Sequence, residues 1–518
     1  MRVKDRARAL WIGLLLAGLS LPFLGKPPHI DDPNFLALAR GAAADPWRPH
    51  AVTLNWQGHT ERAFDVLSNP PGIAWFLAPV ATAPVEVQRG VMLLWLPLLV
   101  WGALGLGRMI GDRAGFALLL GGSPIAALAA GSLTPDLPLL ALTVAGMAGV
   151  LGAPVGRLER AWPWALLLGM AAIFRYSGLV LIPVAALWPL LHGQRRAALA
   201  LGLAAAAPSF ALALHDAHAY GALHVLTMVG FQSVSGSGAE VAHKALAAAA
   251  MLGGAGLLPI LCWRTPLRAG AAALLGGALG ALAGHQAGLS GAGVVATALS
   301  VGAGLASLSG CARARDRLDL LLLCWLGLGL AFLLALRFTA ARYWLPFLPA
   351  AALLSARGAT ERRVWAAVIP TLALSGLLAV DDARLARAQV ALADAAIGAA
   401  RGQRGLFAGH WGFQARMEEA GWTALEEDAP VPPGALLAAS EIAWPQQPAP
   451  GCLRLIGAWQ AEDHWAGPRT HSAAGGANLH ASAVSASPPL ATFAPWTFAD
   501  DPLDTVRLWR GCEDEPVQ

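Results

Sequence analysis

Two adjacent carboxylates, Asp31 and Asp32, stand shortly after the first apolar segment of the chain. At a membrane interface such neighbours repel each other and lose solvation, so they favour a shared proton, a cation or a hydroxyl partner. Those are the requirements of a general base or of a metal ligand, and a divalent metal held by Asp31 and Asp32 is one interpretation. The alternative is structural, because Asp32 before Pro33 is also a good helix start.

A third carboxylate, Asp136, stands in the segment TPDLPLL, at the expected outer end of two apolar stretches. In a site shared with the first pair, it would orient an acceptor, a donor or a cation. A lone aspartate after a proline also caps helices, so the structural interpretation stays open for Asp136 as well.

Two arginine–tyrosine pairs, Arg175 with Tyr176 and Arg342 with Tyr343, interrupt apolar sequence on the same expected side. An arginine at the edge of a membrane is unfavourable unless it meets an anion, and its guanidinium matches a phosphate in two-pronged geometry. Arg342, Tyr343 and Arg175 are therefore candidates for binding a donor phosphate. Interfacial anchoring by snorkelling side chains is the structural alternative.

Membrane-spanning helices must position these residues, because 56% of the 518 residues are hydrophobic and only 13% are charged. A soluble domain carries about a quarter charged residues. At roughly 20 residues per span, the sequence predicts an α-helical polytopic membrane protein with about thirteen transmembrane helices. Their predicted ranges are 9–25, 89–107, 114–131, 136–152, 162–174, 178–191, 197–214, 245–262, 269–288, 290–310, 318–337, 344–356 and 364–380.

The distribution of charge predicts the orientation. One alternate set of connections holds 18 of the 27 basic residues before residue 381, and the positive-inside rule places it, with the N-terminus, in the cytoplasm. The polar segments 26–88 and 381–518 then lie outside. The segment 381–518 carries a net charge of −8, against +12 for the rest of the chain. We expect a transmembrane catalytic domain over 1–380 and a soluble, α/β extracytoplasmic domain over 381–518, whose Cys452 and Cys512 would be able to pair in an oxidising compartment.

In combination, these segments resemble the membrane glycosyltransferases of the GT-C superfamily. The resemblance is to family 39 in particular, which includes protein O-mannosyltransferases and lipid A aminoarabinose transferases. It covers most of residues 1–380. It rests on the acidic pair and on the segments NPPGIAWFLAPV, TPDLPLL, FRYSGLVLIP and ARYWLPFLP. The acidic pair of the family is usually Asp-Glu, so the Asp-Asp pair here leaves the roles of Asp31 and Asp32 undivided.

The resemblance implies a GT-C-like fold in the bacterial cytoplasmic membrane and an inverting hexosyl or pentosyl transferase. The donor would be a polyprenyl-phosphate sugar, and the acceptor a lipid, glycan or protein on the outer face. Membrane lipids would be the other partners, with no nucleic acid. Two further classes stay open: a transporter of polyprenyl lipids or small molecules, and a noncatalytic envelope-assembly protein. The resemblance implies these site residues: Asp31, Asp32 and Asp136 as catalytic, and Arg342, Tyr343 and Arg175 at the donor phosphate.

Overall fold

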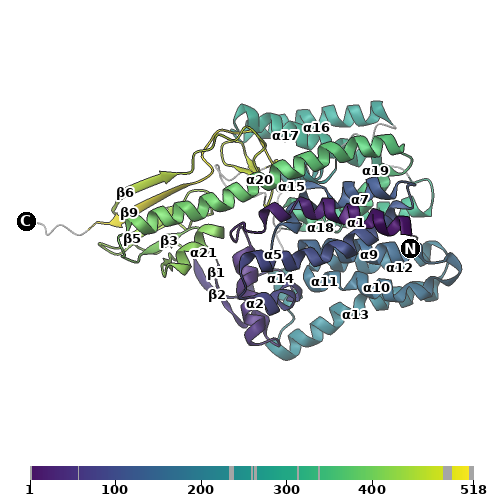
Figure 1. The fold of residues 1–518 in the computed structure, drawn as a ribbon, viewed down its shortest axis with the longest axis horizontal. Coiled ribbons are helices and arrows are strands. Elements are labelled where there is room, and N and C mark those ends of the chain that lie inside the picture. The colour runs from purple at the N-terminus through teal and green to yellow at the C-terminus, as the bar shows by residue number, and fades with distance from the viewer. Residues whose placement is uncertain are drawn as a thin grey trace, which may run out of the picture.

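The computed structural model of the chain is a long helical body with a small mixed sheet beyond one end (Figure 1). It describes residues 3–56, 58–232, 238–257, 261, 265–311, 314–336, 339–481 and 493–512. The N-terminus lies at the end of the helical body that faces away from the sheet (Figure 1).

Seven helical segments in the described part of the chain are long and apolar enough to cross a membrane. A bent helix pair brings the number to eight if the pair counts as one span. The sequence predicted about thirteen spans, and each predicted range overlaps a helix or a pair of consecutive helices. The seven segments are Arg6–Phe23, Val85–Gly107, Arg195–Tyr220, Pro266–Gln286, Gly291–Cys311, Arg317–Ala335 and Glu361–Ala399.

The difference in number comes from helices that are shorter than a bilayer is thick. The bent pair consists of α7 (Arg113–Gly121) and α8 (Pro124–Ala130), which meet at 66°. Ser123 between them is extended, as expected of a residue before proline, so the helix cannot continue through it. The predicted span 162–174 is likewise divided into α10 (Trp162–Gly169) and α11 (Ala171–Phe174).

The remaining helices of the body overlap the predicted ranges, except α14 (His224–Gln232), which lies in none of them. Glycine allows some of them to approach at backbone contact, since a Cβ on Gly102 would stand 2.6 Å from the backbone nitrogen of Ala145. These helices are α1 (Val3–Gly18), α5 (Val85–Met92), α6 (Leu96–Gly107), α9 (Asp136–Gly152), α12 (Leu181–Leu191), α13 (Arg195–Tyr220), α14 (His224–Gln232), α15 (Gly238–Met251), α16 (Pro266–Gln286), α17 (Gly291–Cys311), α18 (Arg317–Ala335) and α19 (Leu348–Ala356).

The polar segment 26–88 folds onto one end of the helical body. It contains α2 (Asp32–Ala44), followed by an antiparallel hairpin of β1 (Thr53–Trp56) and β2 (His59–Arg62). Two short helices, α3 (Ala63–Val66) and α4 (Gly72–Leu77), return the chain to the helical body. α2 and the hairpin lie at the sheet end of the molecule, beside α21 (Trp411–Glu419) (Figure 1).

Helix α20 (Glu361–Ala399) connects the helical body with the C-terminal segment. Its 39 residues correspond to a length of about 58 Å. The predicted domain boundary between residues 380 and 381 lies inside this helix, which passes it without a break.

A five-stranded mixed sheet packs beside the end of α20, in the order β4-β3-β5-β9-β6. The strand β3 runs parallel to β4 and β5, while β9 is antiparallel to β5 and β6. Phe407, Phe413 and Met417 are buried with Leu392 and Ala396 of α20. The strands are β3 (Leu406–Ala408), β4 (Thr423–Ala424), β5 (Leu436–Ser440), β6 (Leu453–Gln460) and β9 (Thr505–Gly511), and a separate pair is formed by β7 (His471–Ser472) and β8 (Ala477–Asn478).

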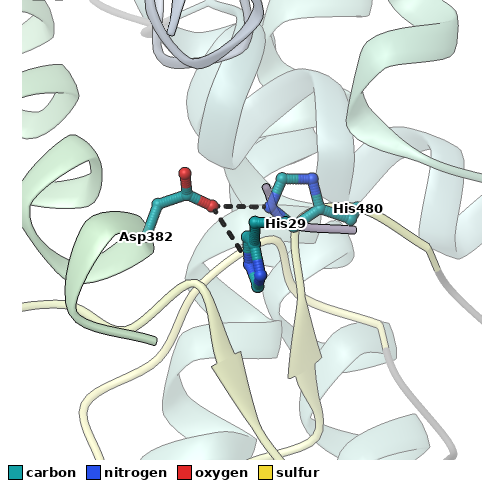
Figure 2. Close-up of side chains that lie close together, drawn as sticks. All are labelled: His29, Asp382 and His480. Carbon is teal, nitrogen blue, oxygen red and sulfur yellow. Dashed lines mark hydrogen bonds and ion pairs between the residues drawn. The ribbon is translucent and has the colours of Figure 1, made fainter. Parts of the chain in front are cut away.

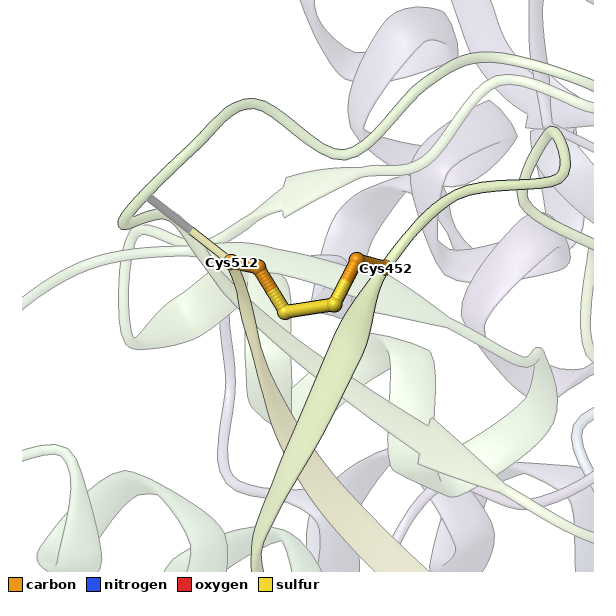
Figure 3. The surroundings of a disulfide bond; sticks show 2 residues. All are labelled: Cys452 and Cys512. Carbon is orange, nitrogen blue, oxygen red and sulfur yellow. A yellow bond between two sulfur atoms is a disulfide. The ribbon is translucent and has the colours of Figure 1, made fainter. Parts of the chain in front are cut away.

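A disulfide joins Cys452 to Cys512, whose pairing the sequence left open. Figure 3 shows the bond between the start of β6 and the end of β9, with the two Cα atoms 5.4 Å apart. The bond closes a sequence separation of 60 residues, which includes β7 and β8.

We expect the double variant Cys452→Ser/Cys512→Ser to unfold at a lower temperature. Removing a cross-link over a loop of this length typically costs about 2–4 kcal/mol of stability. The measurement is the thermal unfolding midpoint in detergent, with and without a thiol reductant. Reductant should lower the midpoint of the wild type and leave that of the double variant unchanged. Equal midpoints for the two proteins without reductant would contradict a stabilising disulfide.

Candidate active site

At the start of α2, the side chains of Asp31 and Asp32 contact different partners. Asp31 is the N-cap residue of α2, but its side chain makes no capping hydrogen bond. Ile30 before it has a positive φ of 52°, which turns the chain sharply into the helix. The first helical turn then contains Asp32 and Pro33. Neither carboxylate therefore acts as the side-chain cap that the structural alternative proposed for this helix.

Asp31 forms an ion pair with Arg342, with 2.7 Å between Oδ2 and the guanidinium. The Asp31 side chain is 28% exposed and that of Arg342 is 15% exposed. Burial is the largest single influence on the pKa of Arg342 and lowers it, but Asp31, Tyr343 and Asp136 together raise this pKa above its ordinary value, so the guanidinium stays charged. Its Nε is buried without a hydrogen-bond partner in the described part of the chain. The pair is therefore partly open to solvent and keeps one donor unused.

Asp136 pairs with Arg175 at 2.5 Å, deeper in the protein than the first pair. The side chains are 2% and 9% exposed, respectively. Asp136 is the first residue of α9, and Arg175 stands directly after α11 in extended conformation. The pair therefore joins two helices of the body.

The ring of Tyr343 joins the two ion pairs. The guanidinium carbon of Arg175 lies 4.9 Å from the ring centroid, and that of Arg342 lies 5.8 Å from it. Both distances are within the range of cation–π attraction. The structure thus brings together five of the six predicted site residues, in the order Asp31, Arg342, Tyr343, Arg175 and Asp136.

The sixth residue, Asp32, faces a different arginine, which the sequence analysis missed. Its Oδ2 lies 2.8 Å from Arg89, and both side chains are 1% exposed. Its carboxylate also accepts backbone hydrogen bonds from Leu133 at 2.8 Å and from His29 at 3.2 Å. Arg89 in turn donates to the carbonyl oxygens of Lys26, Pro27 and Gly131. The sequence shows only that Arg89 stands directly before an apolar run. It does not indicate that Asp32 is the partner of Arg89.

These contacts decide how well a divalent cation fits the acidic pair. Asp31 and Asp32 direct their oxygens to two separate guanidiniums, and both Asp32 oxygens also accept backbone hydrogen bonds. A cation between them would have to displace both arginines. The acidic pair therefore does not fit the metal that was one interpretation of the sequence.

A second buried cluster lies next to α2 and was also missed. Asp382 of α20 pairs with Lys26 at 2.5 Å and accepts a hydrogen bond from His480 Nε2 at 2.9 Å. His29 Nε2 stands 3.7 Å from the same carboxylate (Figure 2). Burial, more than any neighbouring charge, lowers the pKa of His29 to about 3, so its imidazole is neutral. No motif in the sequence indicates that these residues, which are far apart in the chain, lie together.

A cavity of about 600 Å³ lies beside α2. It is bounded by Asn34 and Arg40 of α2, Asn55 of β1, and Gln414 and Arg416 of α21. This cavity thus stands between the segment 26–88 and the C-terminal segment, and none of the six predicted site residues lines it.

We expect Asp32→Asn to destabilise the protein, because it leaves the Arg89 charge buried without its counter-charge. Breaking a buried ion pair on one side typically costs about 3–5 kcal/mol. The thermal unfolding midpoint of the purified protein measures this loss. Asp31→Asn is the matched control, since its partly exposed pair should contribute much less. A smaller shift for Asp32→Asn than for Asp31→Asn would contradict the structural role of Asp32.

Comparisons with known proteins give structural similarity only. No protein-family model and no curated protein matches the chain. Among solved structures, the chain is similar to ArnT from Cupriavidus metallidurans bound to undecaprenyl phosphate, at 14% identity and a TM-score of 0.41. That alignment covers 85% of this chain and 94% of ArnT. The apo structure of the same protein gives 14% identity and a TM-score of 0.39, over 84% and 93% of the two chains.

Proposed function

We propose that the protein is a glycosyltransferase of the cytoplasmic membrane that takes a sugar from a polyprenyl-phosphate donor. The acceptor is a hydroxyl of a lipid, glycan or protein, reached on the outer face. The observation that carries the proposal is the pair of arginines around Tyr343, each held by one aspartate. This arrangement lies in a chain with seven apolar helices of membrane-spanning length among its described residues.

The two guanidiniums form a site for a phosphate. Guanidinium groups bind phosphate oxygens through two parallel hydrogen bonds, and they stay charged in a partly buried place. Arg342 already has an unused buried donor at Nε. In the absence of a donor lipid, Asp31 and Asp136 neutralise the two cations, which removes the penalty of burying them alone.

Donor binding then changes the partner of Arg342. The lipid phosphate and Asp31 compete for the same guanidinium, so phosphate binding releases the Asp31 carboxylate. Asp31 is the most exposed of the three predicted carboxylates, at 28% against 1% for Asp32 and 2% for Asp136. It is therefore the one that an acceptor hydroxyl reaches, and we assign the general base to Asp31 and not to Asp32.

The transfer is a single displacement. The acceptor oxygen attacks the anomeric carbon, its proton passes to Asp31, and the bond between that carbon and the phosphate oxygen breaks. The electron pair leaves with the polyprenyl phosphate, whose growing charge Arg342 and Arg175 stabilise. Attack from the face opposite the phosphate inverts the anomeric configuration.

Asp136 acts by positioning Arg175. It is buried, and its ion pair fixes the guanidinium beside the Tyr343 ring. Tyr343 holds both cations on one surface without competing for the phosphate, because an aromatic ring attracts cations and binds no anion there.

We expect Asp31→Asn to lose transfer of sugar while the protein keeps its abundance and fold. Removing a general base typically lowers the rate by about 10²–10⁴-fold. Transfer of radiolabelled sugar from a panel of polyprenyl-phosphate sugars, in membranes that contain acceptors, measures it. Asp65→Asn is the matched control, because Asp65 lies in the same polar segment on an exposed pair with Arg62. Wild-type membranes that transfer no sugar from any donor would favour a transporter or an assembly protein.

The exchange of partners at Arg342 makes a separate prediction about binding. Asp31→Asn should bind polyprenyl phosphate at least as tightly as the wild type, because it removes the competitor of the phosphate. Arg342→Lys should bind it more weakly, since an ammonium lacks the two-pronged geometry. Equilibrium binding of a labelled polyprenyl phosphate to the purified protein measures both. Weaker binding by a folded Asp31→Asn protein would contradict the exchange.

A further inference from the structure

Three potential metal ligands meet where the polar segment 26–88, helix α20 and the C-terminal segment touch. They are His29 before α2, Asp382 in α20 and His480 after β8. Figure 2 shows the two imidazoles on one side of the carboxylate, with both dashed contacts reaching the same oxygen. One ligand atom from each residue can be chosen so that all three lie within 4.8 Å of one another.

His29 lacks the hydrogen bonds that a buried imidazole normally makes. Its side chain is 1% exposed, and neither ring nitrogen has a hydrogen-bond partner in the described part of the chain. Buried polar groups in native proteins are almost always satisfied, so an orphaned pair of ring nitrogens calls for a missing partner. The ring lies against Trp411 and His480, at centroid distances of 6.3 and 5.8 Å, which confine it on two sides.

We propose that His29, Asp382 and His480 bind a divalent transition metal ion of the zinc type. In a tetrahedral zinc site with ligand bonds of 2.0–2.1 Å, ligand atoms stand about 3.3 Å apart. Here the Asp382 oxygen lies 2.9 Å from His480 Nε2 and 3.7 Å from His29 Nε2, on either side of that separation. Small rotations of the side chains therefore suffice to admit the ion. Two imidazoles and one carboxylate also favour zinc or cobalt over magnesium or calcium.

The surroundings of Asp382 match those of a metal-binding carboxylate. Lys26 holds the second oxygen, at 2.5 Å, and leaves the first to the two imidazoles. Ligating carboxylates are commonly fixed by such an outer partner, which here also offsets their charge. The groups that act electrostatically on Asp382 are Lys26, His480 and His29.

The ion would act as a clamp rather than as a reactant. Asp382 and His480 are 98 residues apart, and His29 comes from the beginning of the chain. One ion would therefore fix the C-terminal segment to α20 and to the turn that precedes Asp31. This inference does not depend on the proposed sugar transfer, because its test measures metal and not activity.

The test uses the full-length protein in detergent, purified without a histidine tag and stripped with a chelator. We expect about one Zn²⁺ per chain on titration, measured by elemental analysis after removal of free ion. Co²⁺ should bind in its place and show the visible absorption of a tetrahedral site. Mg²⁺ should not compete. Metal binding should also raise the thermal unfolding midpoint.

The variants separate the site from background binding. His480→Ala should bind the metal at least about 100-fold more weakly, since even the loss of an outer partner costs 10–100-fold. His464→Ala is the matched control, because His464 is an exposed histidine of the same segment. Equal metal content in wild type and His480→Ala, or equal loss in His464→Ala, would overturn the proposal.

A ligand exchange covers the case in which His480→Ala fails to fold. His480→Cys keeps a ligand at the position, because a thiolate binds zinc and cobalt well. Its Co²⁺ complex should show a near-ultraviolet thiolate-to-cobalt charge-transfer band that the wild type lacks. A folded His480→Cys protein that binds Co²⁺ without this band would show that residue 480 is not a ligand.

Discussion

The burial of charge at the sheet end of the helical body is the constraint on which the rest of the structure depends. An isolated charge in a region of low dielectric is too unfavourable to persist, so a buried ionised carboxylate needs a basic partner or several hydrogen-bond donors. Four of the ion pairs in the described part of the chain lie around the start of α2. They are Asp31 with Arg342, Asp32 with Arg89, Asp136 with Arg175, and Asp382 with Lys26.

The four ion pairs differ in how far they are exposed to solvent. The pair of Asp32 and Arg89 is closed on all sides and joins the beginning of α2 to α5 and to the turn before α9. It therefore fixes the place where its neighbour Asp31 stands. Under the proposed function, Asp31 would respond to a ligand because its own pair is partly exposed, while the buried pair of Asp32 keeps its backbone in place. The structural role and the proposed chemical role would thus belong to two consecutive residues.

The sequence singled out several residues that lie together in the structure, because some residue types are informative alone. An arginine at the edge of an apolar run has few reasons to be there, and Arg175 and Arg342 indeed lie together around Tyr343. The division between Asp31 and Asp32 could not be predicted, since it depends on which of two adjacent side chains faces Arg89. Asp382 and His480 were missed for a related reason. Asp382 lies within a helix that the sequence divides at residue 380, and its partners come from both ends of the chain.

The apolar runs of the sequence predicted where helices lie better than how many helices cross a membrane. A helix that crosses the membrane differs from a shorter apolar helix in its length. A proline such as Pro124 divides an apolar stretch into two helices although the stretch stays apolar throughout. Hydropathy therefore located the bent pair of α7 and α8 as one range, and only the backbone geometry shows its 66° bend.

The unbroken course of α20 has a mechanical consequence. Because α20 is about 58 Å long, a tilt of 5° about its N-terminal end displaces its C-terminal end by about 5 Å. Helices tilt when a bilayer becomes thinner than their apolar length. A change in bilayer thickness would then move Asp382, the five-stranded sheet and the turn before α2 together. The geometry around Asp31 would therefore depend on the surrounding lipid.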